Sequence, residues 1–184
     1  MAKNLHETGY EHRFVAFDFS GFPSVIEVDG ITLNFFNLED AERLDEITSD
    51  DTVQRYIPWA AEDKRAYIER TTTARQNRGP RYAIRLGEIL IGHFAIFPSP
   101  DVQGVIELGY VIDKAYRGQG IIPKVLLECE SIIREQMPKA RIGLAINDEN
   151  EASIRVAQKA GFERTDTISD GDRLYIKVGD QIGQ

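Results

Sequence analysis

The alternation of apolar and polar residues predicts short strands and amphipathic helices along the first half of the chain. Residues 24–36 (SVIEVDGITLNFF) are typical of two strands joined by an Asp-Gly turn. Residues 81–97 predict a second hairpin, and residues 104–112 (GVIELGYVI) predict a third neighbouring strand. Apolar residues recur at helical spacing in residues 38–47 and 61–77, and acidic residues mark the start of the second of these helices.

In the second half of the chain, predicted strands and helices alternate. A helix follows two closely spaced glycines and is expected to end near Met137, because Pro138 restricts the residue before it. A strand over residues 141–146, a helix over residues 151–160 and a closing hairpin within residues 165–178 come next. Early antiparallel strands followed by strand–helix–strand units indicate an α/β (α+β) fold, with a mixed, mostly antiparallel central sheet and helices on both faces.

The segment before the first predicted strand is rich in phenylalanine. Residues 14–22 (FVAFDFSGF) are too apolar to leave together in water. We expect them to pack on the domain or on a second subunit, and an added edge strand is one such arrangement. The four aromatic residues are Phe14, Phe17, Phe19 and Phe22. We therefore predict an N-terminal extension over residues 1–23 and a single domain over residues 24–184, with a homodimer left open.

Composition and charge narrow the class of protein. A chain of 184 residues with 42% hydrophobic and 28% charged residues is typical of one soluble globular domain. The net charge of −8 argues against a general nucleic-acid binder and suits a cationic or amine-bearing substrate. The single cysteine, Cys129, excludes an internal disulfide and fits a reducing compartment. No apolar run is long enough to span a bilayer and residues 1–13 show no secretion signal, so the cytoplasm is the expected location.

Two glycines between a predicted strand and a predicted helix form an informative local motif. Gly118 and Gly120 would let the backbone approach a phosphate at a helix N-terminus, where unpaired N–H groups attract anions. Arg117 adds a permanent cation. On these residues alone, phosphate binding and an ordinary tight turn are equally supported. Ile122 belongs to the apolar stripe of the helix and should point into the protein, and Pro123 is tolerated in the first helical turn.

A second motif follows the glycine loop one strand later. The loop reads YRGQGI (residues 116–121), and residues 147–166 read NDENEASIRVAQKAGFERTD. With the two motifs in this order, the chain resembles the GNAT acyltransferase superfamily, and within it the branch that acetylates the N-terminal amine of ribosomal proteins. The resemblance spans residues 29–178. It implies a GNAT-type central sheet and acetyl-CoA (coenzyme A) as the cosubstrate.

The resemblance implies a set of residues that contact coenzyme A. In the family, backbone amides of the glycine loop hold the pyrophosphate, the preceding strand pairs with the pantetheine arm, and an asparagine after the next strand bonds the pantetheine amides. At the matching positions, the coenzyme-binding residues are Val111, Ile112, Arg117, Gly118, Gln119, Gly120 and Asn150. Ile122 departs from the family pattern, which has glycine or alanine in its place, so the tightness of pyrophosphate binding is left open.

The resemblance also implies the chemistry, which requires a base for the amine and a donor for the leaving thiolate. The family's tyrosine acid is missing, because Ala157 stands in its place. Ser153 matches a serine of the N-terminal-acetylating branch and would hydrogen-bond the thiolate. Helix capping is the alternative for Ser153 and Asn150. Glu107 matches a glutamate of that branch and would relay a proton through water, with a pKa raised by apolar neighbours. The alternative for Glu107 is a solvent-facing strand residue.

Other residues are weaker candidates. Tyr56 and Trp59 lie between the two early helices, where the family shapes its acceptor site, but an aromatic loop packed in the core is equally expected. The sequence suggests no partner for His93, which is interpreted as a packing or surface residue. Cys129 fits the core better than a nucleophilic site. No cluster of His, Cys and carboxylate residues has metal-ligand spacing, so no metal is expected.

These observations lead to three functional hypotheses. The first is an acetyl-CoA-dependent N-acetyltransferase that acts by direct transfer on a primary amine, with a protein N-terminus favoured. The second is an enzyme that acetylates a small cationic amine, such as an aminoglycoside or polyamine, or that transfers another acyl group. The third is a degenerate relative that binds coenzyme A, or nothing, and works through protein contacts. The expected partner is an amine-bearing peptide or small molecule rather than a nucleic acid or a membrane.

Overall fold

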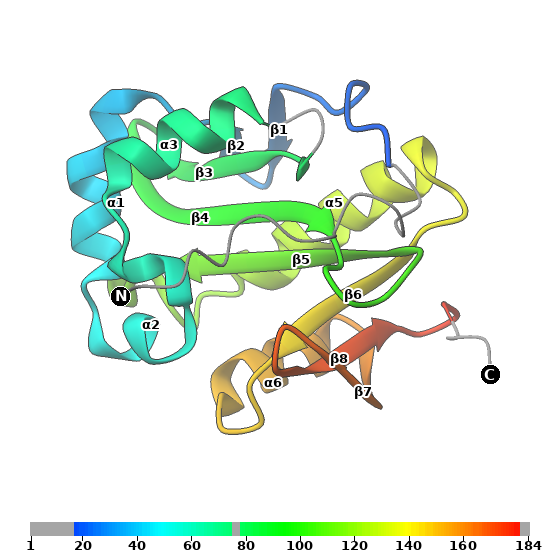
Figure 1. The fold of residues 1–184 in the computed structure, drawn as a ribbon. Helices are drawn as coiled ribbons and strands as arrows, with labels where there is room; N and C mark the ends of the chain where they lie inside the picture. The colour runs from blue at the N-terminus through cyan, green and yellow to red at the C-terminus, as the bar shows by residue number, and fades with distance from the viewer. Residues whose placement is uncertain (1–16, 75–77, 181–184) are drawn as a thin grey trace, which may run out of the picture.

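An eight-stranded sheet forms the middle layer of the molecule (Figure 1). The computed structural model describes residues 17–74 and 78–180. The strands are β1 (Val25–Val28), β2 (Ile31–Phe35), β3 (Arg81–Leu86), β4 (Ile89–Pro98), β5 (Val105–Ile112), β6 (Arg141–Ile146), β7 (Phe162–Ser169) and β8 (Asp172–Lys177). The helices are α1 (Ala41–Thr48), α2 (Asp51–Tyr56), α3 (Lys64–Thr73), α5 (Ile121–Gln136) and α6 (Glu151–Lys159).

The sheet is mixed and mostly antiparallel, as the sequence predicts. Its strand order is β1-β2-β3-β4-β5-β6-β8-β7. β5 and β6 pair in parallel, whereas the other neighbouring pairs are antiparallel. Parallel neighbours need a long crossover connection, and α5 lies in that connection. The predicted fold class is therefore confirmed.

Local sequence explains the turns and the helix starts. Asp29 and Gly30 have φ values of 50° and 78°, which are the positive values of a tight two-residue hairpin turn. α3 begins at Lys64, later than predicted, because the side chain of Asp63 caps it by accepting a hydrogen bond from the backbone N–H of Ala66. The pattern did not predict α2, since its six residues are too few to show an apolar period.

Helices cover both faces of the sheet. α5 packs on one face through an apolar stripe that includes the buried residues Ile122, Val125 and Cys129. α1 and α3 cover the other face, where Leu44 and Ile68 lie in a separate apolar cluster. Side chains that alternate along each strand feed the two clusters in turn. No helix in the described ranges is both long enough and apolar enough to cross a membrane.

The phenylalanine-rich segment packs on the domain itself. Phe19 and Phe22 are 4% and 8% exposed and belong to the same apolar cluster as α5, and Phe17 packs against this cluster. The expected edge strand does not form in residues 17–24, because the N–H of Phe22 donates to the carbonyl of Phe19 and closes a turn. Phe14 lies outside the described residues. The core thus continues into the predicted extension, whose boundary at residue 23 stays a prediction.

Phe19→Ala should lower the free energy of unfolding by about 3 kcal/mol, because truncating a buried aromatic side chain leaves a cavity in a close-packed core. Val25→Ala is the control, since Val25 is 51% exposed, and it should change the free energy by less than about 0.5 kcal/mol. Urea unfolding followed by circular dichroism measures both values. Unchanged stability of Phe19→Ala would show that the segment is not part of the core.

Candidate active site

The pairing between β5 and β6 ends early and leaves a strand edge open. β5 pairs with β6 only at Val105, Ile106 and Glu107, and β6 then turns away from β5 (Figure 1). Residues 108–112 of β5 keep their partners on β4 but have no strand on the other side within the described part of the chain. Backbone N–H and C=O groups on this edge are therefore available to an extended ligand.

A cavity of about 610 Å³ lies beside the open edge, and we call it the splay cavity. It gathers most of the predicted coenzyme-binding residues, and Ser153 with them. The predicted residues that line it are Tyr56, Val111, Ile112, Arg117, Gly118, Gly120, Asn150 and Ser153. Gln119 is not among the lining residues, and its side chain donates to the carbonyl of Ala115 at 3.1 Å. Only the backbone of Gln119 is thus left to contribute to the loop.

The glycine loop leaves the N-terminus of α5 unobstructed. Gly118 and Gly120 have φ values of 77° and 76°, and Gly120 is the N-cap residue of α5. A β-carbon added to either glycine would meet no atom within 4 Å. The space beside the first N–H groups of the helix is therefore open to an anion. Ile122 is 4% exposed and lies in the core, so its side chain does not enter this space.

Arg117 connects the glycine loop to α2. Its Nη2 atom lies 3.3 Å from Oδ1 of Asp50, and its Nε donates to the carbonyl of Ile112 at 3.2 Å. Both contacts hold the guanidinium group beside the splay cavity, which Arg117 lines. An open helix N-terminus with a forked cation next to it suits a pyrophosphate group.

Asn150 and Ser153 stand at the start of α6. Asn150 Oδ1 accepts the backbone N–H of Ser153 at 3.1 Å, so Asn150 caps the helix while it also lines the splay cavity. The side chain of Ser153 faces the hydroxyl of Tyr110. Burial raises the pKa of Tyr110 to about 12, and Ser153 opposes this shift only in part. The Tyr110 oxygen is buried and makes no well-aligned hydrogen bond with the described residues, which leaves a neutral hydroxyl group free to donate.

A second cavity, of about 340 Å³, lies over the sheet face that α3 covers, and we call it the sheet-face cavity. Its floor is hollow because two small residues, Ala95 on β4 and Gly109 on β5, stand opposite each other. Trp59 forms part of the wall, where its ring stacks on Tyr67 with 4.5 Å between ring centroids. The residues that line both cavities are Tyr56, Ile57, Tyr110 and Val111. The two cavities are therefore neighbours.

The predicted acceptor residues lie at these cavities. Trp59 packs against both Tyr67 and His93 and also lines the sheet-face cavity, so it serves as core and as wall. The hydroxyl of Tyr56 donates to the carbonyl of Glu149 at 3.3 Å, which ties the end of α2 to the segment before α6. Contact of Tyr56 and Trp59 with an acceptor stays a prediction.

Glu107 is a buried carboxyl group in the wall of the sheet-face cavity, with only 2% of the residue exposed. Its Oε1 accepts a hydrogen bond of 2.6 Å from the hydroxyl of Ser169, which also lies 3.0 Å from the hydroxyl of Ser99. Burial raises the pKa of Glu107 above its ordinary value, although the two serines favour the carboxylate. The solvent-facing alternative is therefore wrong. A catalytic role for Glu107 stays a prediction.

A buried polar pair on the same sheet face was not predicted. His93 Nε2 lies 2.8 Å from the hydroxyl of Tyr67, while Nδ1 has no hydrogen-bond partner among the described residues. Burial lowers the pKa of His93 to about 3 and raises that of Tyr67 to about 12, so both side chains are neutral at pH 7. The sequence left two interpretations of His93, a packing residue and a surface residue. Because His93 is buried, the packing interpretation is confirmed. Its partner Tyr67 is 26 positions away in the chain, so the local sequence pattern did not connect the two residues. Other lining residues that the sequence did not single out are Arg81, Tyr110 and Asp170.

The fold and the splay cavity define a class of enzyme. A family model described as an acetyltransferase (GNAT) domain matches residues 31–163. The chain belongs to the GNAT acetyltransferase family and is an acetyl-CoA-dependent N-acetyltransferase. The open edge of β5 fits a pantetheine arm, and the open N-terminus of α5 fits a pyrophosphate. No group of three or more His, Cys, Asp or Glu side chains suited to a metal ion occurs in residues 17–74 and 78–180.

Known proteins resemble the chain in sequence and in structure. The uncharacterized N-acetyltransferase YnaD of Bacillus subtilis (strain 168) is 27% identical over 132 residues, which cover 70% of this chain and 76% of YnaD. RimL, a ribosomal L7/L12 alpha-N-protein acetyltransferase solved with coenzyme A, superposes with a TM-score of 0.71 at 18% identity. The match covers 85% of this chain and 98% of the RimL chain. The microcin C7 self-immunity acetyltransferase MccE, solved with acetyl-CoA and AMP, has a TM-score of 0.71 at 22% identity. The match covers 88% of this chain and 99% of the MccE chain. At these identities the two solved structures show a shared fold.

Gly120→Val should weaken coenzyme A binding roughly tenfold or more, because a branched side chain would enter the open space at the N-terminus of α5. Gly179→Val is the control for backbone strain. Gly179 also has a positive φ, of 98°, but it lies beside Asp180, which pairs with Arg134 near the other end of α5. This control should bind normally. Arg117→Ala should weaken binding only modestly, since backbone donors remain.

Isothermal titration calorimetry of the three variants with coenzyme A measures these affinities. Equal affinity of wild type and Gly120→Val would show that the glycine loop does not hold the coenzyme. Weak binding by both valine variants would point to strain rather than to a lost site.

Proposed function

We propose that the enzyme acetylates the primary amine of an acceptor bound in the sheet-face cavity, and that this amine is a protein or peptide N-terminus. The observation that carries the proposal is the buried carboxyl group of Glu107, which lines this cavity from the same strand whose open edge borders the splay cavity. Acetyl-CoA in the splay cavity supplies a thioester carbonyl that an amine can attack. Because the two cavities share lining residues, an amine in one is beside a thioester in the other.

Glu107 serves as the base in this proposal. An α-amino group has a pKa of about 7.7–8.0, so much of it is protonated at pH 7 and must lose a proton before it attacks. The raised pKa of Glu107 brings its proton affinity closer to that of the amine. The hydrogen bond from Ser169 fixes the orientation of the carboxylate. Transfer through one water molecule is sufficient to reach the amine.

Ser153 and Tyr110 serve as donors to the departing sulfur. Ser153 is held at the first turn of α6, where it lines the splay cavity. Tyr110 faces Ser153 and keeps its proton at pH 7, because burial raises its pKa to about 12. A phenol is a stronger acid than an aliphatic hydroxyl, so Tyr110 is the better of the two proton donors.

The preference for a protein N-terminus is supported by the matching Glu107 and Ser153 positions and by the shared fold with RimL, which carries the name of an alpha-N-protein acetyltransferase. A small amine is the second candidate, because a cavity of about 340 Å³ has room for one. Peptides with free N-terminal Ser or Ala, followed by polyamines and aminoglycosides, are the acceptors to screen.

Glu107→Gln should lower turnover on an accepted amine by roughly 10²–10⁴-fold, because it keeps the size of the side chain and removes the base. Acetyl-CoA affinity should stay nearly unchanged. In the wild type, activity should rise with pH through the raised pKa of Glu107, and the variant should lack this rise. Steady-state kinetics across pH 5 to 9 measures both effects, and full activity of the variant would eliminate Glu107 as the base.

The stability of the same variant separates lost catalysis from lost folding. Since burial raises the pKa of Glu107 above 4.5, the protonated group stabilises the fold below that pH, and this contribution disappears as pH rises through the raised pKa. Glu107→Gln lacks this titration. The melting temperature of the variant relative to wild type should therefore increase between pH 4 and pH 8. A constant difference would show that the carboxyl group titrates normally.

Tyr110→Phe should lower kcat by roughly ten- to a hundredfold, as expected for the loss of a hydrogen bond to a developing negative charge. KM for acetyl-CoA should change little. Ser153→Ala should cost less, since water can replace an aliphatic hydroxyl. Presteady-state measurement of acetyl transfer checks both variants, and an unchanged rate for Tyr110→Phe would exclude Tyr110 as the donor.

A further inference from the structure

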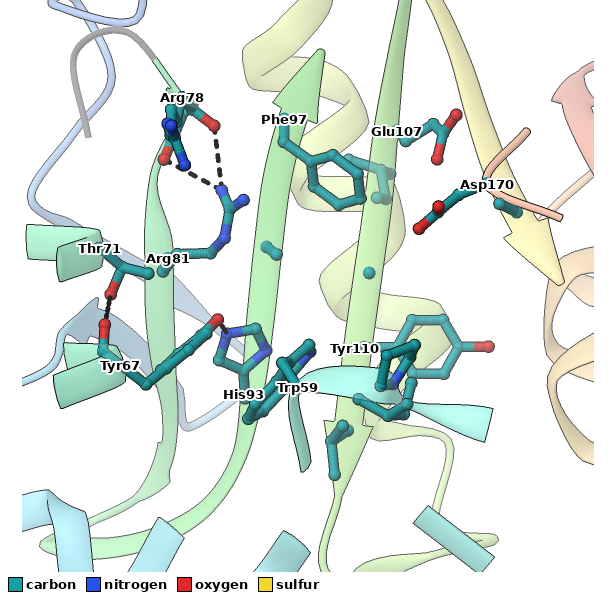
Figure 2. A pocket seen from close by; sticks show the side chains of 18 of the residues that line it. Trp59, Tyr67, Thr71, Arg78, Arg81, His93, Phe97, Glu107, Tyr110 and Asp170 are labelled. Atoms are coloured by element: carbon teal, nitrogen blue, oxygen red, sulfur yellow. Dashed lines mark hydrogen bonds between the residues drawn. The ribbon is translucent and has the colours of Figure 1, made fainter. Parts of the chain in front are cut away.

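Arg81 places a guanidinium group in the wall of the sheet-face cavity without an acidic partner. Its Nη1 donates to the backbone carbonyls of Arg78 and Gly79, each at 3.1 Å (Figure 2). The same atom also donates to the carbonyls of Ile96 at 3.1 Å and Pro80 at 3.4 Å. No ion pair among the described residues includes Arg81. The group lies over the ring of Phe97, 5.0 Å from the ring centroid. Burial lowers the pKa of Arg81, and the neighbouring hydroxyl of Tyr67 opposes part of this shift.

The charge of Arg81 is not balanced at this end of the cavity. Arg78 is exposed, lines the same cavity and also takes part in no ion pair within the described ranges. Arg70 is a third cation, but it is already paired with Glu62 at 2.7 Å. The backbone carbonyls that accept hydrogen bonds from Nη1 of Arg81 carry no negative charge, and no carboxylate of the described residues forms an ion pair with Arg81 or Arg78. Arg81 and Arg78 therefore form a positive end that an anionic ligand group would neutralise.

The opposite end of the cavity is acidic. Glu107 and Asp170 lie on the far side of Phe97 from Arg78 and Arg81 (Figure 2). Asp170 occupies the tight turn between β7 and β8 with a φ of 50°. Its backbone N–H donates to Asp101 at 2.7 Å and fixes the turn beside the cavity. The cavity thus carries charges of opposite sign at its two ends.

The strand register sets the distance between these ends. Arg81 stands opposite Ala95 on β4, and Ala95 stands opposite Gly109 on β5. Because neighbouring strands are about 4.8 Å apart, the backbones of Arg81 and Gly109 are separated by roughly 10 Å. Glu107 projects from the same face as Gly109, two residues along the strand. The small side chains of the floor leave this span free for a ligand.

We infer that the acceptor carries an anionic group, a carboxylate or a phosphate, close to the amine that is acetylated. The inference rests on the proposed function, because it assigns the amine to the Glu107 end of the cavity and the anion to Arg81 and Arg78. The planar fork of a guanidinium group matches the paired oxygens of carboxylates and phosphates. The same arrangement rejects polyamines and aminoglycosides, whose additional ammonium groups would face two arginines in a partly buried site. The net charge of −8 is thus a poor guide to the acceptor.

Three pairs of acceptors that differ only in the anionic group test the inference and identify its source. Serine and serinamide test a free carboxylate, phosphoethanolamine and ethanolamine test a phosphate, and the peptide amides Ser-Glu-Ala and Ser-Gln-Ala test an acidic side chain. With saturating acetyl-CoA, kcat/KM should be roughly ten- to a hundredfold higher for the charged member of at least one pair, mainly through KM. Spermidine should be a poor acceptor.

Variants show whether the arginines cause the preference. Arg81→Gln and Arg78→Gln should each reduce the ratio within the pair, and Arg81→Lys should restore part of it. Arg65→Gln is the matched control, because Arg65 is exposed on α3 and does not line the cavity. Arg81 also holds backbone carbonyls, so Arg81→Gln can lose stability. The side chain of Arg78 forms no ion pair within residues 17–74 and 78–180, so Arg78→Gln keeps the test valid.

Each result has a distinct meaning. A charge preference that falls in the Arg81 and Arg78 variants, but not in Arg65→Gln, supports the inference. Equal use of both members of every pair, or a preference that no arginine variant changes, overturns it and leaves the proposed function intact. No transfer to any of these amines, despite binding of acetyl-CoA, overturns the proposed function and the inference together.

Discussion

The early end of the β5–β6 pairing is the constraint on which the site depends. Three residues of β5 find partners on β6, and no strand in the described part of the chain pairs with residues 108–112 on that side. Unpaired groups that water cannot reach are costly in a sheet, so this edge must either face solvent or receive a ligand with its own hydrogen-bonding groups. The same separation moves α6 away from β5 and creates the splay cavity, into which the N-terminus of α5 opens. One interruption in the sheet therefore leaves an open strand edge and an open helix N-terminus beside one cavity, where we expect coenzyme A to bind.

A buried carboxyl group, Glu107, and a partly buried guanidinium group, Arg81, line the sheet-face cavity, where we propose that the acceptor binds. Burial raises the pKa of Glu107 and lowers that of Arg81. Glu107 accepts a hydrogen bond from Ser169, whereas Arg81 donates to backbone carbonyls. An interior optimised for stability would join such groups or replace them with apolar side chains. Here Ala95 and Gly109 lie between the two groups on neighbouring strands, and their small size leaves the space between Glu107 and Arg81 open. The acceptor that we propose, with an amine at one end and an anionic group at the other, would offset both charges, which is the expected relation between stability and activity at a binding site.

Local patterns predicted the elements well, because strands and amphipathic helices of ordinary length carry a clear period. They missed α2, which is too short to show one. The motif around Gly118, Gly120, Asn150 and Ser153 located the splay cavity, since these residues are close together in the loops that the fold requires. The sheet-face cavity was harder to predict. Tyr67, His93 and Arg81 meet only because α3 lies across β3 and β4, and a register over several strands cannot be derived from single segments.

The position of Ala157 explains how the site can function without the tyrosine that the family often uses on this helix. Ala157 is fully buried in the apolar cluster and does not line the splay cavity. A tyrosine there would have to displace core side chains, at the cost that overpacking brings. Tyr110 lines the cavity from the strand instead, and Ser153 on α6 lines the same cavity. A phenol group from β5 can therefore take the place of one from α6, because the open strand edge and the helix face the same space.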